Sequence, residues 1–219
     1  MISLHILGVV SYSSRSTMQN PMQAKDNSKD WWENRYQSQT PYLYPKEPSS
    51  FLLEFVGLLP EKAQAIDLGC GEGHNAVALA LKGHQVRGID FSETALNRAE
   101  DLAKASGLHI EFRKADLDFF IPDLMSFDAI FCIDMKPSPT LMKNMLRGLR
   151  KDGMIFIEAH LVKAMKKKKE LELFECFKPG ELLKHWAIGP NFRVVYYNEL
   201  KPDLDREKVQ IIIQKTEML

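Results

Sequence analysis

The stretch AIDLGCGEGHN, Ala65 to Asn75, decides the fold, because it places three glycines on alternate positions between a strand-like run and a helix-like one. Glycine loses the most backbone freedom on folding, so glycines this close together are costly unless the backbone needs them. In an open α/β sheet, ligands bind at the carboxyl ends of the strands, where loops of this kind lie. The stretch therefore predicts a strand, a ligand-binding loop and a helix, in that order.

Strand-like and helix-like segments alternate from this stretch to the C-terminus. Runs rich in β-branched and apolar residues predict strands over residues 64–69, 84–90, 108–116, 127–134, 154–160, 192–200 and 208–215. Helical periodicity and capping residues predict helices over residues 49–60, 74–83, 92–107, 140–150 and 179–186. The last two strands are joined by too few residues for a crossover helix, so they should pair antiparallel. We expect a Rossmann-like α/β fold, with a mostly parallel seven-stranded sheet, helices on both faces and an antiparallel last strand.

The ends of the predicted helices carry recognisable caps. Ser92 can cap the helix that Gly107 ends, and Ser49 or Ser50 can cap the helix before the first strand. Gly83 is expected to end the helix that follows the glycine loop.

A chain of 219 residues favours one domain with appendages. Residues 1–29 are expected to form a disordered arm, residues 30–63 a lid and a helix, and residues 64–219 the core domain. No Lys or Arg precedes the short apolar run near the N-terminus, which favours a tail, or a later start at Met18 or Met22, over a secretory leader. Whether residues 1–21 belong to the mature protein stays open.

Composition narrows the class of partner. The 29 Lys and Arg balance the 29 Asp and Glu, so no overall field attracts nucleic acid, and no apolar run is long enough to span a membrane. The basic run from Lys166 to Lys169 is followed by Glu170, Glu172 and Glu175, which favours a solvated helix face over an anion site. Three scattered cysteines, without a CxxC pair, predict no metal site and fit a reducing cytoplasm.

The glycine loop differs from the common phosphate-binding loops. Dinucleotide sites use GxGxxG, whereas here His74 stands where the third glycine should be, and no GxxxxGK[ST] motif occurs. The loop therefore suits a ligand that lies against the backbone without a diphosphate.

Three aspartates at strand ends suggest what that ligand is. Asp90 ends the second strand, where an acid can accept hydrogen bonds from both hydroxyls of a ribose. Asp116 ends the third strand, where it can meet an exocyclic amino group such as that of adenine. Asp67, inside the loop, can attract a cationic amino group or instead fix the turn. Ribose, adenine and an amino acid portion without phosphate together describe S-adenosylmethionine.

These segments resemble a known family. AIDLGCGEG, GIDFS and KADL resemble the first three motifs of the class I S-adenosylmethionine-dependent methyltransferases, in the right order and at similar intervals. Upstream, WWENRYQSQTPYLYPKEPSSFL, and later FKPGELLKHW, resemble a narrower branch that includes tellurite-resistance and thiopurine methyltransferases. The family resemblance implies that the cofactor is bound by Asp67, Gly69, Gly71, Gly73, Asp90, Phe91, Asp116 and Leu117, and the narrower resemblance adds the lid residues Trp32, Arg35 and Tyr44.

Catalytic residues are weakly marked, because methyl transfer mainly requires alignment and exclusion of water. Asp134, Glu158 and His160 follow or end the fourth and fifth strands and point to the reaction side, with Asp134 and His160 as the candidates for catalysis. Two alternatives stay open: Asp134 can instead cap the next turn, and His160 can be a structural histidine.

The leading hypothesis is a cytoplasmic enzyme that methylates a small molecule at a soft nucleophile, such as a thiol, selenium or tellurium species. One alternative is a protein or RNA methyltransferase, and another is a non-catalytic protein that binds S-adenosylmethionine. The acceptor and the oligomeric state cannot be read from the sequence.

Overall fold

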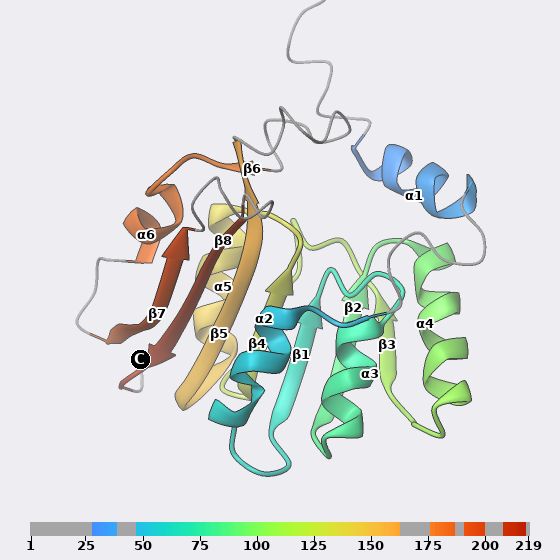
Figure 1. The fold of residues 1–219 in the computed structure, drawn as a ribbon, viewed down its shortest axis with the longest axis horizontal. Helices are drawn as coiled ribbons and strands as arrows, with labels where there is room; N and C mark the ends of the chain where they lie inside the picture. The colour runs from blue at the N-terminus through green and yellow to red at the C-terminus, as the bar shows by residue number, and fades with distance from the viewer. Residues whose placement is uncertain (1–27, 39–46, 163–175, 187–190, 200–207, 218–219) are drawn as a thin grey trace, which may run out of the picture.

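A computed structural model describes residues 28–38, 47–162, 176–186, 191–199 and 208–217 (Figure 1). One sheet runs through this part of the chain, with the strand order β3-β2-β1-β4-β5-β8-β7 and with β6 paired to β5 beside that path. The strands are β1 (Gln64–Leu68), β2 (Gln85–Asp90), β3 (Glu111–Lys114), β4 (Phe127–Ile133), β5 (Leu149–Leu161), β6 (Cys176–Phe177), β7 (Phe192–Glu199) and β8 (Lys208–Lys215). The α-helices are α1 (Ser28–Ser38), α2 (Ser50–Phe55), α3 (His74–Leu81), α4 (Glu93–Ala105), α5 (Pro139–Gly148) and α6 (Glu181–Trp186).

The strand pairing confirms the predicted fold class. β1 pairs in parallel with both β2 and β4, so the strand order reverses direction at the carboxyl end of β1, where ligands bind in open α/β sheets. β8 runs antiparallel to β5 and to β7, as the short connection between the last two strands predicted. The two-residue β6 is an addition that the sequence pattern did not reveal.

The central strands β1, β4 and β5 are buried on both faces of the sheet, which explains why they read as nearly unbroken apolar runs. Along β4, Ala129, Phe131 and Ile133 pack with α2, whereas Ile130 and Cys132 pack with α5 on the other face. Figure 1 shows α2 and α3 in front of the sheet and α5 behind it. The core thus holds the strands rigidly, and their carboxyl ends are fixed in position.

The helix ends follow the predicted capping residues. Ser92 Oγ accepts a hydrogen bond from Ala95 N at 3.1 Å, and Ser49, rather than Ser50, caps α2 by accepting from Leu52 N at 3.4 Å. The glycine predicted to end α4, Gly107, has φ of +69°.

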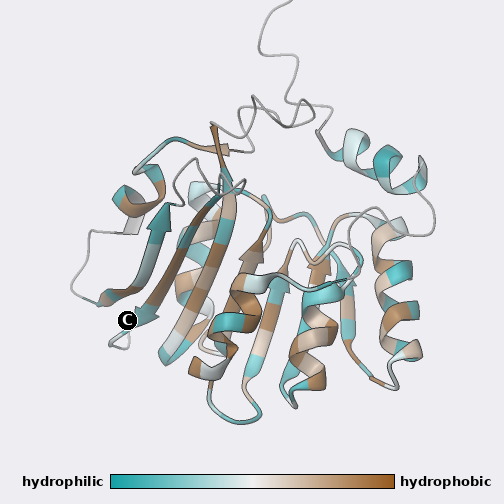
Figure 2. Cartoon of the chain, viewed as in Figure 1, coloured by the Kyte–Doolittle hydropathy of each residue, from teal (hydrophilic) through white to brown (hydrophobic). Residues whose placement is uncertain are grey.

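Figure 2 shows hydrophobic residues concentrated along the central strands, whereas α1 is mainly hydrophilic. Within residues 29–38 of α1, only Tyr36 is buried. Among the described helices, none combines the length and the apolar character needed to cross a membrane. Most of the arm predicted for residues 1–29, the lid candidate Tyr44 and the run Lys166 to Lys169 lie outside the described residues.

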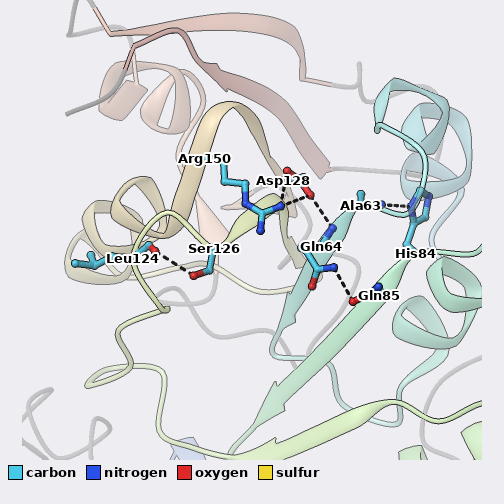
Figure 3. Close-up of polar contacts among 8 residues, drawn as sticks. All are labelled: Ala63, Gln64, His84, Gln85, Leu124, Ser126, Asp128 and Arg150. Atoms are coloured by element: carbon cyan, nitrogen blue, oxygen red, sulfur yellow. Dashed lines mark hydrogen bonds and ion pairs between the residues drawn. The ribbon is translucent and has the colours of Figure 1, made fainter.

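A polar network lies at the amino edge of the sheet, which is the side where the parallel strands begin (Figure 3). The carboxyl edge is the opposite side, where these strands end. The Asp128 carboxylate accepts a hydrogen bond from Gln64 N at 2.8 Å and forms an ion pair with Arg150 at 3.0 Å. Beside it, Ala63 N donates to His84 Nδ1 at 3.2 Å. These contacts join the starts of β1 and β4 to the start of β5, at the edge opposite to the glycine loop.

Candidate active site

The glycine loop leaves β1 in a backbone conformation that requires its glycines. Gly69, Gly71 and Gly73 have φ of +72°, +50° and +82°, in the left-handed region that side chains disfavour. Gly69 N and Cys70 N both donate to Ile89 O, at 2.8 and 3.0 Å, which ties the loop to β2. The loop is therefore anchored to two strands at the point where the strand order reverses.

Protein side chains pack against all three glycines. A Cβ at Gly73 would meet the Cβ and backbone of Ala99, whereas at Gly69 and Gly71 it would have to displace the end of a side chain. A Cβ built on each glycine would lie 2.5 Å from Met135 Sδ at Gly69, 2.9 Å from Tyr36 Oη at Gly71, and 2.8 Å from Ala99 Cβ at Gly73. The third glycine thus allows α4 to pack closely against the start of α3.

Asp67 is a buried carboxyl with unused hydrogen-bonding capacity. Its side chain is at the end of β1, the residue is 1% exposed, and among the described residues its Oδ2 has no hydrogen-bond partner. Burial, with the negative charge of Asp90 as a further cause, raises the pKa of Asp67 to about 7. A cationic group beside this oxygen would offset the cost of burying it.

Asp90 at the end of β2 is also buried, but it is held by the backbone. Its two carboxylate oxygens accept from Gly71 N at 2.8 Å and from Ser92 N at 2.9 Å. Burial raises the pKa of Asp90 despite these hydrogen bonds. Each oxygen keeps a further lone pair, so the carboxylate could also accept from the hydroxyls of a ribose. Phe91, the next residue, is partly buried.

Asp116 lies beyond the end of β3 and forms an ion pair with Lys29 from α1. Its Oδ1 also accepts from Asp118 N at 3.0 Å. Burial alone would raise the pKa of Asp116, but the hydrogen bonds and the charge of Lys29 lower it. Leu117 lies 3.8 Å from the Cβ position of Gly69, so this loop borders the glycine loop.

Helix α1 is tied to the glycine loop through α4. Arg98 donates to the buried Glu72 at 2.8 Å and to Tyr36 O at 2.8 Å, so one guanidinium links the loop to α1. Glu33 accepts from Thr94 Oγ1 at 2.5 Å and adds a second link to α4. Figure 1 shows α1 lying across the end of α4 on the same side as the carboxyl ends of the strands.

Of the predicted lid residues, Arg35 stacks its guanidinium on Trp31 and Trp32, with 4.9 and 5.8 Å from its carbon to the ring centroids. Trp32 is partly buried, and Trp31 is exposed. Tyr36, which the sequence interpretation omitted, is the α1 side chain that touches the glycine loop. The signal for it was present, because Tyr36 directly follows Arg35 in the same aromatic segment.

The other side of the glycine loop meets the end of β4. Asp134 directly follows β4 with φ of +60°, and its N–H donates to Glu158 O at 2.8 Å. Lys208 Nζ lies 2.5 Å from Asp134 Oδ1 and 2.8 Å from Glu158 Oε1. His160 lies opposite Lys208 in the antiparallel register. The structure therefore brings Asp134 and Glu158 together at Lys208, and it pairs His160 with Lys208 in the strand register. The sequence interpretation did not include Lys208, because a lysine at the start of a strand is common.

The cysteines are not joined in disulfides. Cys70, Cys132 and Cys176 are all buried, and burial raises the pKa of Cys70 and Cys132. Within the part of the chain that the structure describes, no group of three His, Cys, Asp or Glu side chains could hold a metal ion.

Comparison with known proteins decides the family. Residues 65–153 match the family model described as Methyltransferase domain. A curated relative, the ubiquinone biosynthesis O-methyltransferase of Actinobacillus pleuropneumoniae serotype 7, is 30% identical over 161 residues, which cover 63% of this chain and 68% of the relative. The chain belongs to the class I S-adenosylmethionine-dependent methyltransferases.

Solved structures of this methyltransferase fold agree. A SAM-dependent methyltransferase from Methanosarcina mazei superposes with a TM-score of 0.60 and 21% identity, covering 78% of this chain and all of that one. TehB from Haemophilus influenzae superposes with a TM-score of 0.60 and 18% identity, covering 86% and 66% of the two chains. Likeness at these identities shows the fold.

The cofactor of this methyltransferase is S-adenosylmethionine, and the site suits it. The cofactor carries a cationic amino group, and Asp67 offers a buried carboxylate oxygen with no hydrogen-bond partner among the described residues. The glycine loop begins two residues after Asp67, and its three glycines have positive φ and carry no side chains. A buried carboxylate oxygen beside such a loop suits an amino acid portion without phosphate.

Proposed function

We propose that this enzyme transfers the methyl group of S-adenosylmethionine to a hydroxyl of a small molecule. The observation that carries the proposal is Asp134, a carboxylate beside the glycine loop. Its side chain is 43% exposed, and the next residue, Met135, lies against Gly69. An acceptor hydroxyl held between Asp134 and the loop would meet both a proton acceptor and the methyl donor.

The cofactor contacts proposed from the sequence gain support from the geometry. Asp67 would hold the amino group, the backbone at Gly69, Gly71 and Gly73 would border the methionine portion, and Asp90 would accept from the ribose. Phe91 and Leu117 would pack on the adenine, with Asp116 at its amino group. Helix α1, with Trp32, Arg35 and Tyr36, would cover the site; Tyr44 lies outside the described residues.

The chemistry needs little from the protein beyond alignment and one proton acceptor. S-adenosylmethionine supplies an electrophilic methyl group, and the electrons of the broken carbon–sulfur bond stay on sulfur. Asp134 would take the hydroxyl proton as the new oxygen–carbon bond forms, and its exposed side would return the proton to water. Helix α1 would keep water from the methyl group. His160, which pairs with Lys208 in the strand register, would lie on the side of the site where the acceptor binds.

The charge of the carboxyl edge favours an acceptor that arrives neutral. Among the described residues, the acids there include Asp67, Asp90, Asp116, Asp134 and Glu158. Lys29 and Lys208 beside them are already ion-paired, and Arg35 on α1 is stacked on two tryptophan rings. An oxyanion would be repelled, whereas a hydroxyl can donate to a carboxylate. The relative from Actinobacillus pleuropneumoniae is named as an O-methyltransferase, which also favours oxygen.

A soft nucleophile, such as a thiol or a tellurium species, is the second candidate. The aromatic segment around Trp31 favours it, because that segment resembles the tellurite-resistance and thiopurine branch. A neutral thiol would meet the same carboxylate, so the charge argument weakens only the anionic members of this class.

An acceptor panel separates these candidates. Purified enzyme and S-adenosylmethionine with a labelled methyl group would be offered neutral phenols and catechols, neutral thiols, and selenite or tellurite, with products identified by mass. We expect a methyl ether from a hydroxyl acceptor. Methylation of thiols or oxyanions alone would overturn the hydroxyl proposal, and methylation only of protein or RNA from a cell extract would overturn the small-molecule proposal.

A further inference from the structure

Lys208 lies at the centre of a polar cluster that joins three strands at the carboxyl edge. Its Nζ contacts Asp134 at the end of β4 and Glu158 on β5, at 2.5 and 2.8 Å. Gln210, two residues further along β8, donates to the other Glu158 oxygen at 2.5 Å. Glu158 is 3% exposed, so both of its oxygens are held inside the protein.

The cluster is connected to the helix that follows the glycine loop. Ser49 Oγ donates to Glu158 Oε1 at 3.1 Å, and Ser49 N donates to Asn75 Oδ1 at 2.9 Å. Asn75 lies in the first turn of α3. An unbroken chain of polar contacts therefore runs from the start of α3 through Ser49, Glu158 and Lys208 to Asp134.

Lys208 remains charged in this cluster. Burial alone would lower the pKa of Lys208, but the charges and hydrogen bonds of Asp134 and Glu158 raise it overall. The cluster then holds one cation between two carboxylates. The cation can restrain Asp134 by charge as well as by contact.

Asp134 requires such a restraint. Its φ of +60° is a conformation that residues other than glycine adopt at a cost, and such residues persist only where their surroundings hold them. The hydrogen bond from its N–H to Glu158 O holds its backbone, and Lys208 holds its side chain. The cluster thus sets the direction of the one carboxylate that we propose as the proton acceptor.

A fully buried lysine on the same strand shows what a lysine with a structural role looks like. Lys215, at the other end of β8, is 1% exposed and donates to Leu146 O at 3.3 Å and to Leu149 O at 2.9 Å. Its partners are backbone carbonyls at the ends of α5 and β5, whereas Lys208 contacts two acidic side chains beside the glycine loop.

We propose that Lys208 is a positioning residue for methyl transfer, which aims the Asp134 carboxylate at the acceptor and fixes that aim relative to the helix behind the cofactor. This inference rests on the proposed function, in which Asp134 takes the acceptor proton. Loss of Lys208 leaves the cofactor contacts in place but lets Asp134 turn away. Misplacement by about 1 Å is enough to slow an aligned reaction about 100-fold.

The test compares Lys208→Met, Lys208→Arg and Lys215→Met for kcat, KM, thermal midpoint and the Kd of S-adenosylmethionine. For Lys208→Met we expect kcat to fall about 100-fold while the cofactor Kd changes less than about twofold. Lys208→Arg should recover much of kcat, because it restores the charge. Lys215→Met should lower the thermal midpoint and leave kcat, measured well below that midpoint, unchanged.

Glu158→Gln provides a second variant if Lys208→Met does not fold. It keeps the shape of the Glu158 side chain but removes the negative charge that pairs with Lys208. We expect a smaller fall in its kcat, about 3-fold to 10-fold. Wild-type kcat in either folded variant, or an equal loss in Lys215→Met, would overturn the inference. Failure of the proposed function would look different, since the wild-type enzyme itself would then fail to bind S-adenosylmethionine or to methylate any hydroxyl.

Discussion

The two edges of the sheet are built from the same kinds of residue but pair them differently. At the amino edge, Asp128 is satisfied by Gln64 N and Arg150, and the network is closed within the protein (Figure 3). At the carboxyl edge, Asp67 is buried with an oxygen that has no hydrogen-bond partner among the described residues, and Asp134 faces solvent in a disfavoured backbone conformation. A buried acid with an unpartnered oxygen is costly to folding. Among the described residues Asp67 is the one such acid, and its place at the carboxyl edge favours that edge as the site of binding and chemistry.

Substituting one aspartate at each edge should give the largest difference in kcat between the two edges. Asp134→Asn removes the proposed proton acceptor, and we expect kcat to fall about 100-fold or more with the cofactor Kd unchanged. Asp128→Asn weakens a network at the amino edge, so it should lower the free energy of unfolding by about 1 kcal/mol and leave kcat unchanged. Steady-state kinetics and urea unfolding measure both. Equal kinetic losses at the two edges would contradict the contrast.

Asp67→Asn tests the carboxyl edge through the pH dependence of the free energy of unfolding. Because burial raises the pKa of Asp67 to about 7, the folded state binds its proton more tightly than the unfolded state does. The free energy of unfolding of the wild type should therefore fall as pH rises from about 4 to 7, and Asp67→Asn should lose this decline. The variant should be more stable by about 4 kcal/mol above pH 7.

The same residue should make cofactor binding depend on pH. In the wild type, the affinity for S-adenosylmethionine should rise as Asp67 ionises near pH 7, whereas Asp67→Asn should bind about 10-fold more weakly at pH 8 and lack this rise. Calorimetry between pH 5.5 and 8.5 measures it, with the range chosen to bracket the pKa of about 7. An identical pH dependence in both proteins would remove Asp67 from the cofactor site.

Alanine substitutions at two glycines with similar backbone angles distinguish the cost of backbone strain from the cost of a steric clash. Gly73 and Gly83 have φ of +82° and +91°, but a Cβ would meet Ala99 at Gly73 and nothing within 4 Å at Gly83. Both substitutions to alanine should cost about 1 kcal/mol of backbone strain, and Gly73→Ala should cost about 2 kcal/mol more through overpacking. Only Gly73→Ala should also weaken cofactor binding. Chemical unfolding measures the loss of stability, and calorimetry measures the cofactor Kd. Equal values for Gly73→Ala and Gly83→Ala in both measurements would contradict this account of the loop.

Weakening the contact by which Arg98 joins α1 to the glycine loop should have the smallest effect of these substitutions. Arg98→Lys keeps the charge but cannot hold Glu72 and Tyr36 O together as the guanidinium does, so we expect the cofactor Kd to rise about 3-fold to 10-fold. Lys104→Met, on the same helix, removes an exposed ion pair with Glu100 at 3.6 Å and should leave the Kd unchanged. No difference between these variants would mean that α1 does not cover the cofactor.

The fold was predictable because its signals are local. The caps at Ser92 and Gly107, the apolar strands and the glycine loop each depend on short-range chemistry, and the structure confirms the mostly parallel sheet with an antiparallel last strand. The acidic strand ends followed from the rule that ligands bind at that edge.

The connections between distant residues were not predictable in the same way. Lys208 and Asp134 are far apart in the sequence, and only the antiparallel pairing of β8 with β5 brings the lysine to the carboxyl edge. Tyr36 and Arg98 meet because α1 lies against α4, which no periodicity in either helix predicts. The two-residue β6 is too short to leave a pattern.

The most direct measurement of the central claim is hydrogen–deuterium exchange of the wild-type enzyme with and without S-adenosylmethionine. The carboxyl edge should gain protection, in peptides that contain residues 67–73, 90–92 and 116–118. The amino edge, in peptides around residues 63–64, 84–85 and 126–128, should exchange equally in both conditions. Protection at the amino edge, or none at the glycine loop, would contradict the account.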